Sequence, residues 1–287
     1  MRTSWSSGAL TQGSLIYADP LAEALQVDAS GTWLLDASDS GYLYAIPITS
    51  SGAVDSSRTT PQPVPLASTV KQGSMAISPT NSGAIIAVAL GTAGTQVFPF
   101  NYNSATPISA AYTPTIAPYG PQGTATAVSV AIDPQNSYLY IGETNAFPNS
   151  TTNSRGGLRF FKIISNGVNP VVTIPYAPTG TGPNAILPSA SGSYVYTADW
   201  NGTSAGNITG YSVSSSGLTL VSSVATGADP LSLAEDSTGS FVLEVGSNGS
   251  PYFNAFTFDG TTAGQLDADL TSTTQGNFIA VVAAAKQ

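Results

Sequence analysis

Four carboxylate residues fall at related positions of a repeated pattern, and they are the first candidates for chemistry. Glu143 and Asp199 each lie seven residues after a turn residue, whereas Asp36 and Glu244 each lie five residues after one. Because side chains alternate between the faces of a strand, a difference of two positions keeps all four on one side. Carboxylate oxygens can hold Ca²⁺ or another divalent cation, polarise a carbonyl group and activate water. We predict Glu143 and Asp199 as a catalytic and metal-binding pair, with Asp36 and Glu244 as ligand-binding neighbours.

Four further residues complete the predicted ligand-binding set. Asn184 and Asn277 lie where first strands begin, and Trp200 and Arg155 lie in loops. Exposed aromatic side chains bind sugar rings and protein partners. The structural alternatives are turn capping by Asp and Asn side chains, a Trp folded over the edge of its own sheet, and an Arg that serves solubility.

Several mechanisms are excluded because the chain of 287 residues contains neither His nor Cys. Ser-His-Asp and Cys-His catalysis, His-ligated or thiolate metal sites and disulfides are therefore impossible. A general base would have to be a carboxylate or Lys71.

The candidate residues are positioned by a repeat of four short β-type runs, which is most complete between Gly182 and Val224. No segment shows the i, i+3, i+4, i+7 spacing of an amphipathic helix. A period of roughly 40 to 50 residues with four strands per period is typical of a β-propeller. We therefore predict one all-β domain over residues 1–287. The turn between first and second strands recurs at Gly31, Gly83, Asn136, Gly192 and Gly239.

The repeat predicts five complete blades and one composite blade. A copy of the outer strand near Thr106 is degenerate. The chain begins in an outer hairpin, with strands expected at Trp5–Leu10 and Ser14–Tyr17, and Asn277–Val282 is spaced as the next first strand. Pairing of these two ends would close a six-bladed ring and remove open sheet edges, with seven blades as the alternative. The complete blades are expected at Pro20–Val70, Lys71–Pro118, Tyr119–Thr181, Gly182–Ala228 and Asp229–Gln275.

Two stretches carry a family resemblance: Gly182-Pro183-Asn184 with the following Tyr194-Val195-Tyr196-Thr197-Ala198-Asp199, and Trp5-Ser6-Ser7-Gly8-Ala9-Leu10-Thr11. They resemble repeats of the lactonase-family propellers, which include bacterial 6-phosphogluconolactonase and surface proteins with YVTN-type repeats. The resemblance covers nearly the whole chain and implies a propeller, usually of seven blades, so this chain resembles a shortened member. It also implies hydrolysis of a sugar lactone. The matching residues are structural, and a phosphorylated substrate would require several cations.

Composition limits the partners. The net charge of −9 at pH 7 argues against nucleic acid and anionic membranes. Nowhere does the chain have the run of about 18 apolar residues that a spanning helix needs. Met1–Trp5 lacks the apolar core of a signal peptide. The scarcity of Lys and the wealth of Ser, Thr, Asn and Gly are nevertheless typical of an exported protein, so we expect a periplasmic or secreted location.

Two functions remain open. The first is a binding propeller with an acidic channel rim that meets a small molecule, a sugar or a protein partner. The second is a lactone hydrolase assisted by carboxylates or by a divalent metal. The absence of His, the few cations and the incomplete ring favour the first. The site is expected on the rim with Glu143 and Asp199, because loops there vary in length, and variable loops on a rigid scaffold commonly carry binding.

Overall fold

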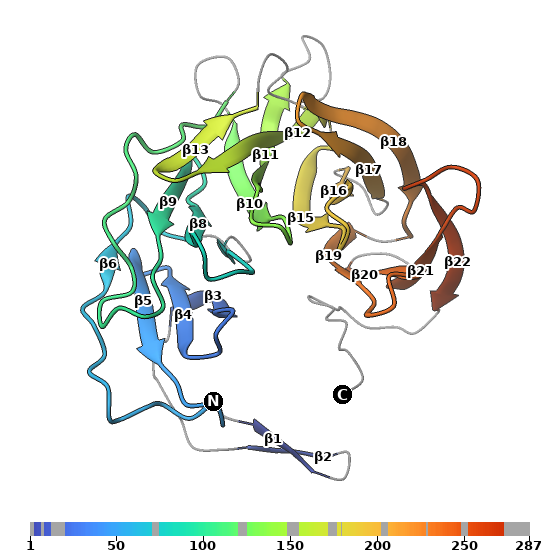
Figure 1. Cartoon of the computed structure of the whole chain (residues 1–287). Coiled ribbons are helices and arrows are strands. Elements are labelled where there is room, and N and C mark those ends of the chain that lie inside the picture. Colours follow the sequence, from blue (N-terminus) through green and yellow to red (C-terminus); the bar gives the residue numbers. More distant parts are fainter. Residues whose placement is uncertain are drawn as a thin grey trace.

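A computed structural model describes most of the chain, and every regular element in the described part is a β-strand. The sheets follow one another around a common centre (Figure 1). No described helix is long and apolar enough to cross a membrane. The described residues are 3–6, 9–12, 21–70, 75–119, 125–147, 155–171, 177–178, 180–201, 206–227, 229–247 and 252–272.

Five of the sheets are antiparallel meanders that correspond to the five predicted blades. The first contains β3 (Ala22–Val27), β4 (Trp33–Ser38), β5 (Tyr42–Pro47) and β6 (Val64–Pro65). The second contains β7 (Met75–Ile77), β8 (Ile85–Ala89) and β9 (Thr95–Pro99). The third contains β10 (Thr126–Ile132), β11 (Tyr138–Phe147), β12 (Arg155–Ile164) and β13 (Gly167–Pro170), with β14 (Ala177–Pro178) also paired to β12. The fourth contains β15 (Gly182–Pro188), β16 (Tyr194–Trp200), β17 (Asn207–Ser214) and β18 (Gly217–Ala225). The fifth contains β19 (Asp229–Glu235), β20 (Phe241–Ser247), β21 (Phe253–Phe258) and β22 (Leu266–Ser272).

An N-terminal hairpin forms a separate two-stranded sheet of β1 (Thr3–Ser6) and β2 (Ala9–Gln12). The predicted single strand over Trp5–Leu10 is wrong, because Trp5 pairs with Leu10 instead of sharing a strand with it. The expected second strand, Ser14–Tyr17, lies outside the described residues. Asn277–Val282 and Lys71 lie outside the described residues. Closure of the ring by the two chain ends therefore stays a prediction.

The turns between first and second strands are as uniform as the sequence predicts. Their landmark residues all have left-handed backbone, with φ from 54° at Asn136 to 71° at Gly192. A carboxylate stabilises three of these turns, since Asp28, Asp133 and Asp236 each accept hydrogen bonds from three backbone N–H groups. Such Asx-type bonds satisfy the polar groups that a tight turn leaves open.

Side chains also link these turns from one blade to the next. Asn136 Nδ2 donates to the carbonyl oxygens of Ser82 and Gly83 in the second blade, at 3.0 and 3.2 Å. In the fourth blade, Ala190 accepts a bond from Gln135 through its carbonyl and donates its N–H to Glu235 Oε2 of the fifth blade. Hydrogen bonds therefore join this rim across four consecutive blades.

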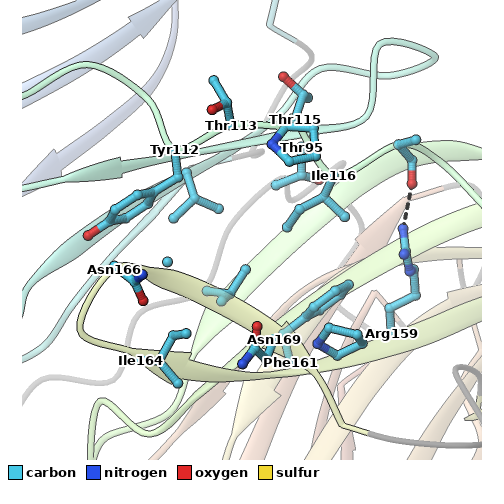
Figure 2. Close-up of a pocket in the computed structure, with 16 residues that line it drawn as sticks. Thr95, Tyr112, Thr113, Thr115, Ile116, Arg159, Phe161, Ile164, Asn166 and Asn169 are labelled. Carbon is cyan, nitrogen blue, oxygen red and sulfur yellow. Dashed lines mark hydrogen bonds between the residues drawn. The ribbon is translucent and has the colours of Figure 1, made fainter.

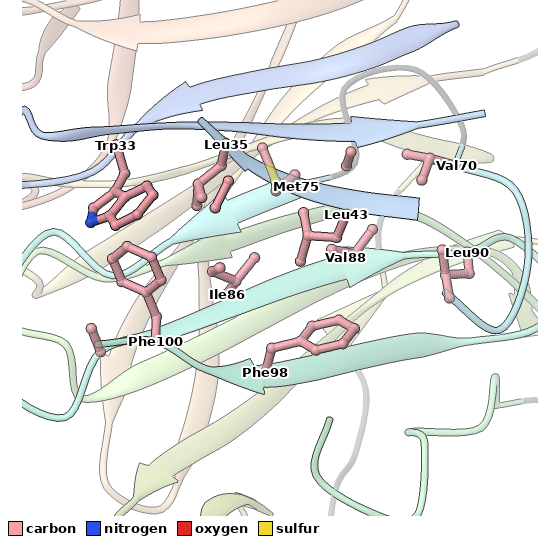
Figure 3. Close-up of a cluster of buried hydrophobic side chains, with 13 residues drawn as sticks. Trp33, Leu35, Leu43, Val70, Met75, Ile86, Val88, Leu90, Phe98 and Phe100 are labelled. Carbon is pink, nitrogen blue, oxygen red and sulfur yellow. The ribbon is translucent and has the colours of Figure 1, made fainter. Parts of the chain in front are cut away.

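The core is divided into clusters between neighbouring blades. Figure 3 shows the cluster between the first two blades, where Trp33 and Leu35 pack against Ile86 and Phe98. Ile85 and Ile86 are neighbours in β8 and face opposite sides of the sheet, so Ile85 joins the cluster between the second and third blades. Second strands thus bury both faces, which explains their nearly continuous apolar sequences. Each large apolar side chain buried in this way contributes roughly 1.5–3 kcal/mol.

The second blade has an irregular outer edge, as the degenerate repeat near Thr106 predicts. Instead of a fourth strand, residues 108–116 run beside β9 through isolated backbone bonds. Tyr112 N donates to Val97 O at 2.8 Å, and Ile116 N donates to Thr95 O at 2.9 Å. Pro114, between these contacts, has no N–H to donate. The outer segment is therefore attached to its blade at a few points only.

Candidate functional site

The strand register supports the predicted equivalence of the four carboxylates. Glu143 and Asp199 both lie directly past a bulge in the neighbouring first strand. Asp36 and Glu244 share the position two residues earlier in their own blades. All four residues are at most 1% exposed. They are buried within the blades and in the seams between them, and an acidic channel rim formed by these four residues stays a prediction.

Glu143 belongs to an ion pair in the seam between the second and third blades. Its Oε1 lies 3.1 Å from Arg159 Nη1, and its Oε2 accepts the N–H of Tyr119 at 3.1 Å. Arg159 Nη1 also donates to the carbonyl of Ala117 at 2.7 Å. The guanidinium lies 4.9 Å above the centre of the Phe161 ring. Glu143 and Arg159 therefore hold residues 117–119, which lead from the second blade into the third.

Asp199 lies in the seam between the third and fourth blades. Its side-chain partner is a hydroxyl group, whereas the partner of Glu143 is a cation. Thr209 Oγ1 donates to Asp199 Oδ2. Burial raises the pKa of Asp199 to about 7, and hydrogen bonds from Thr209, Thr197 and the backbone of Gly180 limit that rise. The carboxylate is thus half protonated near neutral pH.

Glu244 resembles Asp199 in its surroundings. Asn254 Nδ2 donates to its Oε2. Burial raises the pKa of Glu244 to about 7, against the opposing effect of that hydrogen bond. Both carboxyl groups are destabilised as anions because a buried charge loses its hydration.

The partners of these carboxylates come from one position of the third strand. In each blade, the partner pairs with a second-strand residue at the same place. That place is two positions before the residue that lies directly past the bulge. The three partners are Arg159, Thr209 and Asn254. The sequence analysis did not identify this relation. It becomes visible only when the second and third strands of each blade are paired, because the connecting loops differ in length.

The predicted metal pair of Glu143 and Asp199 stays a prediction. Within the described ranges, no group of three or more acidic side chains is arranged to hold a metal ion. Glu143 is neutralised by Arg159, and Asp199 belongs to a different seam.

Asn184 has a structural contact. Its Nδ2 donates to the carbonyl of Pro230 at 3.0 Å and so ties β15 to β19. Ser129 makes the equivalent bond from β10 to Pro183 at 2.6 Å. The side chain of Asn184 thus joins the inner strands of neighbouring blades.

Trp200 and the two remaining candidates have different positions. Trp200 is 39% exposed, and its ring lies over Gly182 of its own blade, 3.5 Å from the place of a Cβ there. This contact favours the structural alternative for Trp200. Arg155 begins β12 opposite Phe147, and its side chain is not described. Asn277 lies outside the described residues.

A cleft that the sequence analysis did not predict lies between the second and third blades. Its volume is about 590 Å³, and its walls are the outer segment of the second blade and strands β12 and β13 of the third (Figure 2). Hydroxyl, amide and apolar side chains line it, and Arg159 is the one charged residue in the lining. Representative lining residues are Thr95, Tyr112, Thr115, Phe161 and Asn169.

Glycine permits the close approach of the chain beneath this cleft. A Cβ at Gly94 would lie 2.2 Å from the carbonyl oxygen of Ile116, and the φ of Gly94 is +88°. At the other end, the ring of Tyr112 packs 3.7 Å from the place of a Cβ at Gly167. A side chain at Gly94 would therefore displace the wall at Ile116, whereas a Cβ at Gly167 would make an ordinary contact with Tyr112.

Two polar atoms of the cleft lining have no partner among the described residues. Thr95 Oγ1 and Arg159 Nε are buried and make no hydrogen bond. Both hydrogen bonds of the guanidinium use Nη1. Thr95 bonds through its backbone to Ile116, and Arg159 bonds to the next residue, Ala117. Thr95 and Arg159 therefore both bond to the outer segment of the second blade, at the consecutive residues Ile116 and Ala117.

These antiparallel blades, packed face to face around a centre, define a propeller-like fold, and solved structures agree. A functionally unknown protein from Desulfotomaculum acetoxidans DSM 771 is 17% identical with a TM-score of 0.58, over 88% of this chain and 70% of that one. A protein from Bacteroides uniformis ATCC 8492, provisionally assigned as a 6-phosphogluconolactonase, is 14% identical with a TM-score of 0.59, over 85% and 68%. The β-propeller domain of Cps50 (Swd1) from Myceliophteria thermophila is 12% identical with a TM-score of 0.55, over 91% and 76%.

At these identities the likeness shows the fold. The chain is similar to lactonase-like propellers, as the resemblance in its repeats predicts. No family model matches the chain, and no curated protein matches it.

Proposed function

We propose that this protein is a ligand-binding propeller and that its ligand enters the cleft between the second and third blades. The observation that carries the proposal is the cleft itself, whose lining combines hydroxyl and amide side chains with the guanidinium of Arg159. The cavity of about 590 Å³ also falls within the usual range for small-molecule sites, roughly 300–1,000 Å³.

The direct test is a crystallographic or NMR screen with chemically diverse fragments. We expect fragments to gather in this cleft and to perturb residues 112–117 and 164–170. The Gly94→Ala variant, which moves the wall at Ile116, should lose these hits. Fragment binding elsewhere with this cleft empty would overturn the proposal.

Lactone hydrolysis is the second candidate, and one observation favours it. Asp199 and Glu244 have pKa values raised to about 7 by burial, in the range that suits a general acid or base. The test is hydrolysis of gluconolactone-type substrates with and without a chelator, on wild type, Glu143→Ala and Asp199→Asn. Turnover that is lost with the chelator and in both variants would establish a metal-assisted hydrolase. Rates equal to the uncatalysed reaction would eliminate this candidate.

For the architecture, we propose six blades closed by Asn277–Val282 and the N-terminal hairpin. The support comes from β3, where Leu25 and Val27 are 57% and 52% exposed. Leu25 pairs with Asp36, so it lies on the face opposite Leu35, which packs on the second blade. A further blade would cover that apolar face. Deleting residues 276–287 should lower solubility and the melting temperature, and a monomeric variant with an unchanged melting temperature would refute this closure.

A further inference from the structure

We propose that the ligand of the inter-blade cleft is a neutral saccharide, an inference that rests on the proposed function and specifies it. The first argument is the chemistry of the lining. Hydroxyl groups and side-chain amides, including those of Thr113, Thr115, Asn166 and Asn169, can each donate and accept hydrogen bonds. Sugar hydroxyls have the same double capacity, so either partner can supply the proton.

The second argument is charge. Arg159 is the one charged residue of the lining, and its charge is compensated by Glu143 at 3.1 Å behind it. An anionic ligand would have to compete with that carboxylate in a chain whose net charge is −9. Separating a buried pair is unfavourable because it leaves a desolvated charge without a partner. A neutral ligand leaves the pair intact and can still use the remaining donors of the guanidinium.

The third argument is the position of the cleft within the fold. It opens between the faces of two blades, so side chains line most of its surface (Figure 2). Strand β13 is an edge of the third sheet, so the peptide probe tests whether the cleft takes an added strand instead. The apolar groups of Ile116, Ile164 and Val168 lie among the polar ones. This mixture suits a compact molecule that combines hydroxyl groups with C–H surfaces.

The side chain of Arg159 is pre-organised for such a ligand. Glu143, the carbonyl of Ala117 and the Phe161 ring fix the guanidinium, and both of its hydrogen bonds use Nη1. A fixed donor loses little conformational entropy when it binds. We therefore infer that Arg159 donates to a hydroxyl or ring oxygen of the sugar, and that Glu143 is its positioning residue.

The experiment is a calorimetric and NMR titration of the full chain with three sets of probes. The neutral set is glucose, galactose, mannose, maltose and cellobiose, the anionic set is gluconate and glucose 6-phosphate, and the third is a proline-containing pentapeptide. The variants are Arg159→Lys, which keeps a positive charge beside Glu143, and Asn169→Ala on the exposed wall. Arg58→Lys is the matched control, because Arg58 also lies over an aromatic ring and donates to a backbone carbonyl, but in the first blade.

We expect at least one neutral saccharide to bind, with affinity reduced about tenfold or more in Arg159→Lys and Asn169→Ala and unchanged in Arg58→Lys. Preference for the anionic probes or for the peptide would overturn the saccharide assignment and leave a binding cleft in place. Saccharide binding that no cleft variant weakens would overturn it as well. Failure of every probe, together with an empty cleft in the fragment screen, would remove the proposed function too.

Discussion

Two neighbouring seams of the molecule are built on the same repeat position and differ in almost everything else. In the seam between the second and third blades, Glu143 meets the guanidinium of Arg159, and a cleft opens beside it. In the seam between the third and fourth blades, Asp199 meets the hydroxyl of Thr209. There, Tyr140, Val195 and Tyr211 form a buried cluster.

At one position of the third strand, the first seam has Arg159 and the second has Thr209. A guanidinium needs more space and more acceptors than a hydroxyl group, and Arg159 takes one of its acceptors from the backbone of Ala117. The loosely attached outer segment of the second blade supplies that carbonyl. In the second seam a small hydroxyl satisfies one carboxylate oxygen, and burial raises the pKa of Asp199 to about 7. The ion pair thus accompanies the seam with the cleft, called the open seam, and the carboxylate–hydroxyl pair accompanies the seam with the buried cluster, called the closed seam.

The largest expected effect comes from removing the cation of the open seam. Arg159→Met leaves Glu143 buried without its charged partner, so the free energy of unfolding should fall by about 3–5 kcal/mol. Arg58→Met, which removes a cation that has no ion pair among the described residues, should cost about 1 kcal/mol or less. Urea denaturation measures both. The double variant Glu143→Gln/Arg159→Met should regain much of the loss, and equal losses for the two arginine variants would show that the pair is unimportant.

The closed seam should respond to pH instead. Because the pKa of Asp199 is raised from 3.8 to about 7, the folded state keeps a proton that the unfolded chain releases. Its stabilisation is complete below about pH 4 and is lost as the pH rises through 7. At about 1.4 kcal/mol per pKa unit, the change is on the order of a few kcal/mol.

Asp199→Asn should therefore be more stable than wild type at pH 8, less so at pH 5 and similar to it below about pH 4, as measured by urea denaturation at the three values. Asp236 and Asp259, whose pKa values are lowered to about 2 by hydrogen bonds from Thr238 and Thr261, titrate below this window. The assignment would be refuted if the stability of wild type rose between pH 5 and pH 8 and the stability of Asp199→Asn rose by the same amount.

A smaller effect is expected from the wall of the open seam. Gly94→Ala places a Cβ 2.2 Å from the carbonyl oxygen of Ile116 at a φ of +88°, and should cost about 1–3 kcal/mol. Gly91→Ala is the control, since it has a similar φ of +61° but only a 3.8 Å contact with Thr126, and should cost about 1 kcal/mol. Hydrogen exchange should rise at residues 112–117 in Gly94→Ala alone. Equal behaviour of the two variants would mean that backbone conformation, and not contact with the wall, decides the cost.

The smallest effect concerns the hydroxyl partner in the closed seam. Thr209→Val keeps the shape of the side chain but removes its bond to Asp199, so stability should fall by about 1 kcal/mol at pH 5. The pKa of Asp199 should rise further, because that bond favours the anion. The measurement is NMR titration of the carboxyl carbon. A lowered pKa would contradict this account of the seam.

The sequence predicted the local features of the fold well. Gly31 and Asn136 marked turns that do have left-handed backbone, and the degenerate copy near Thr106 corresponds to a blade without a regular fourth strand. Equal spacing from the turns also placed Glu143 and Asp199 at the same register position. These features depend on chain neighbours, whose spacing is written directly in the sequence.

The contacts of the site could not be predicted in the same way. Arg159 and Thr209 occupy equivalent positions, but the loops before them differ in length, so counting from the turn does not align them. Alternation indicated one common side for Glu143 and Asp199, but it could not show what fills each seam. The cleft depends on a segment of the second blade meeting strands of the third, a long-range contact that no local pattern encodes.

The hydrogen bonds that link the tight turns from blade to blade have a mechanical consequence. Asn136, Gln135 and Glu235 bind that rim to the backbone of adjacent blades, whereas the opposite rim carries longer and more varied loops. Under thermal or applied stress, neighbouring blades should therefore separate first at the rim with the longer loops and stay together at the rim with the linked turns. Amide hydrogen exchange at 25 °C should accordingly be slowest beside the linked turns. In an atomic-force experiment, these turns should bear the applied force before the inner strands unfold.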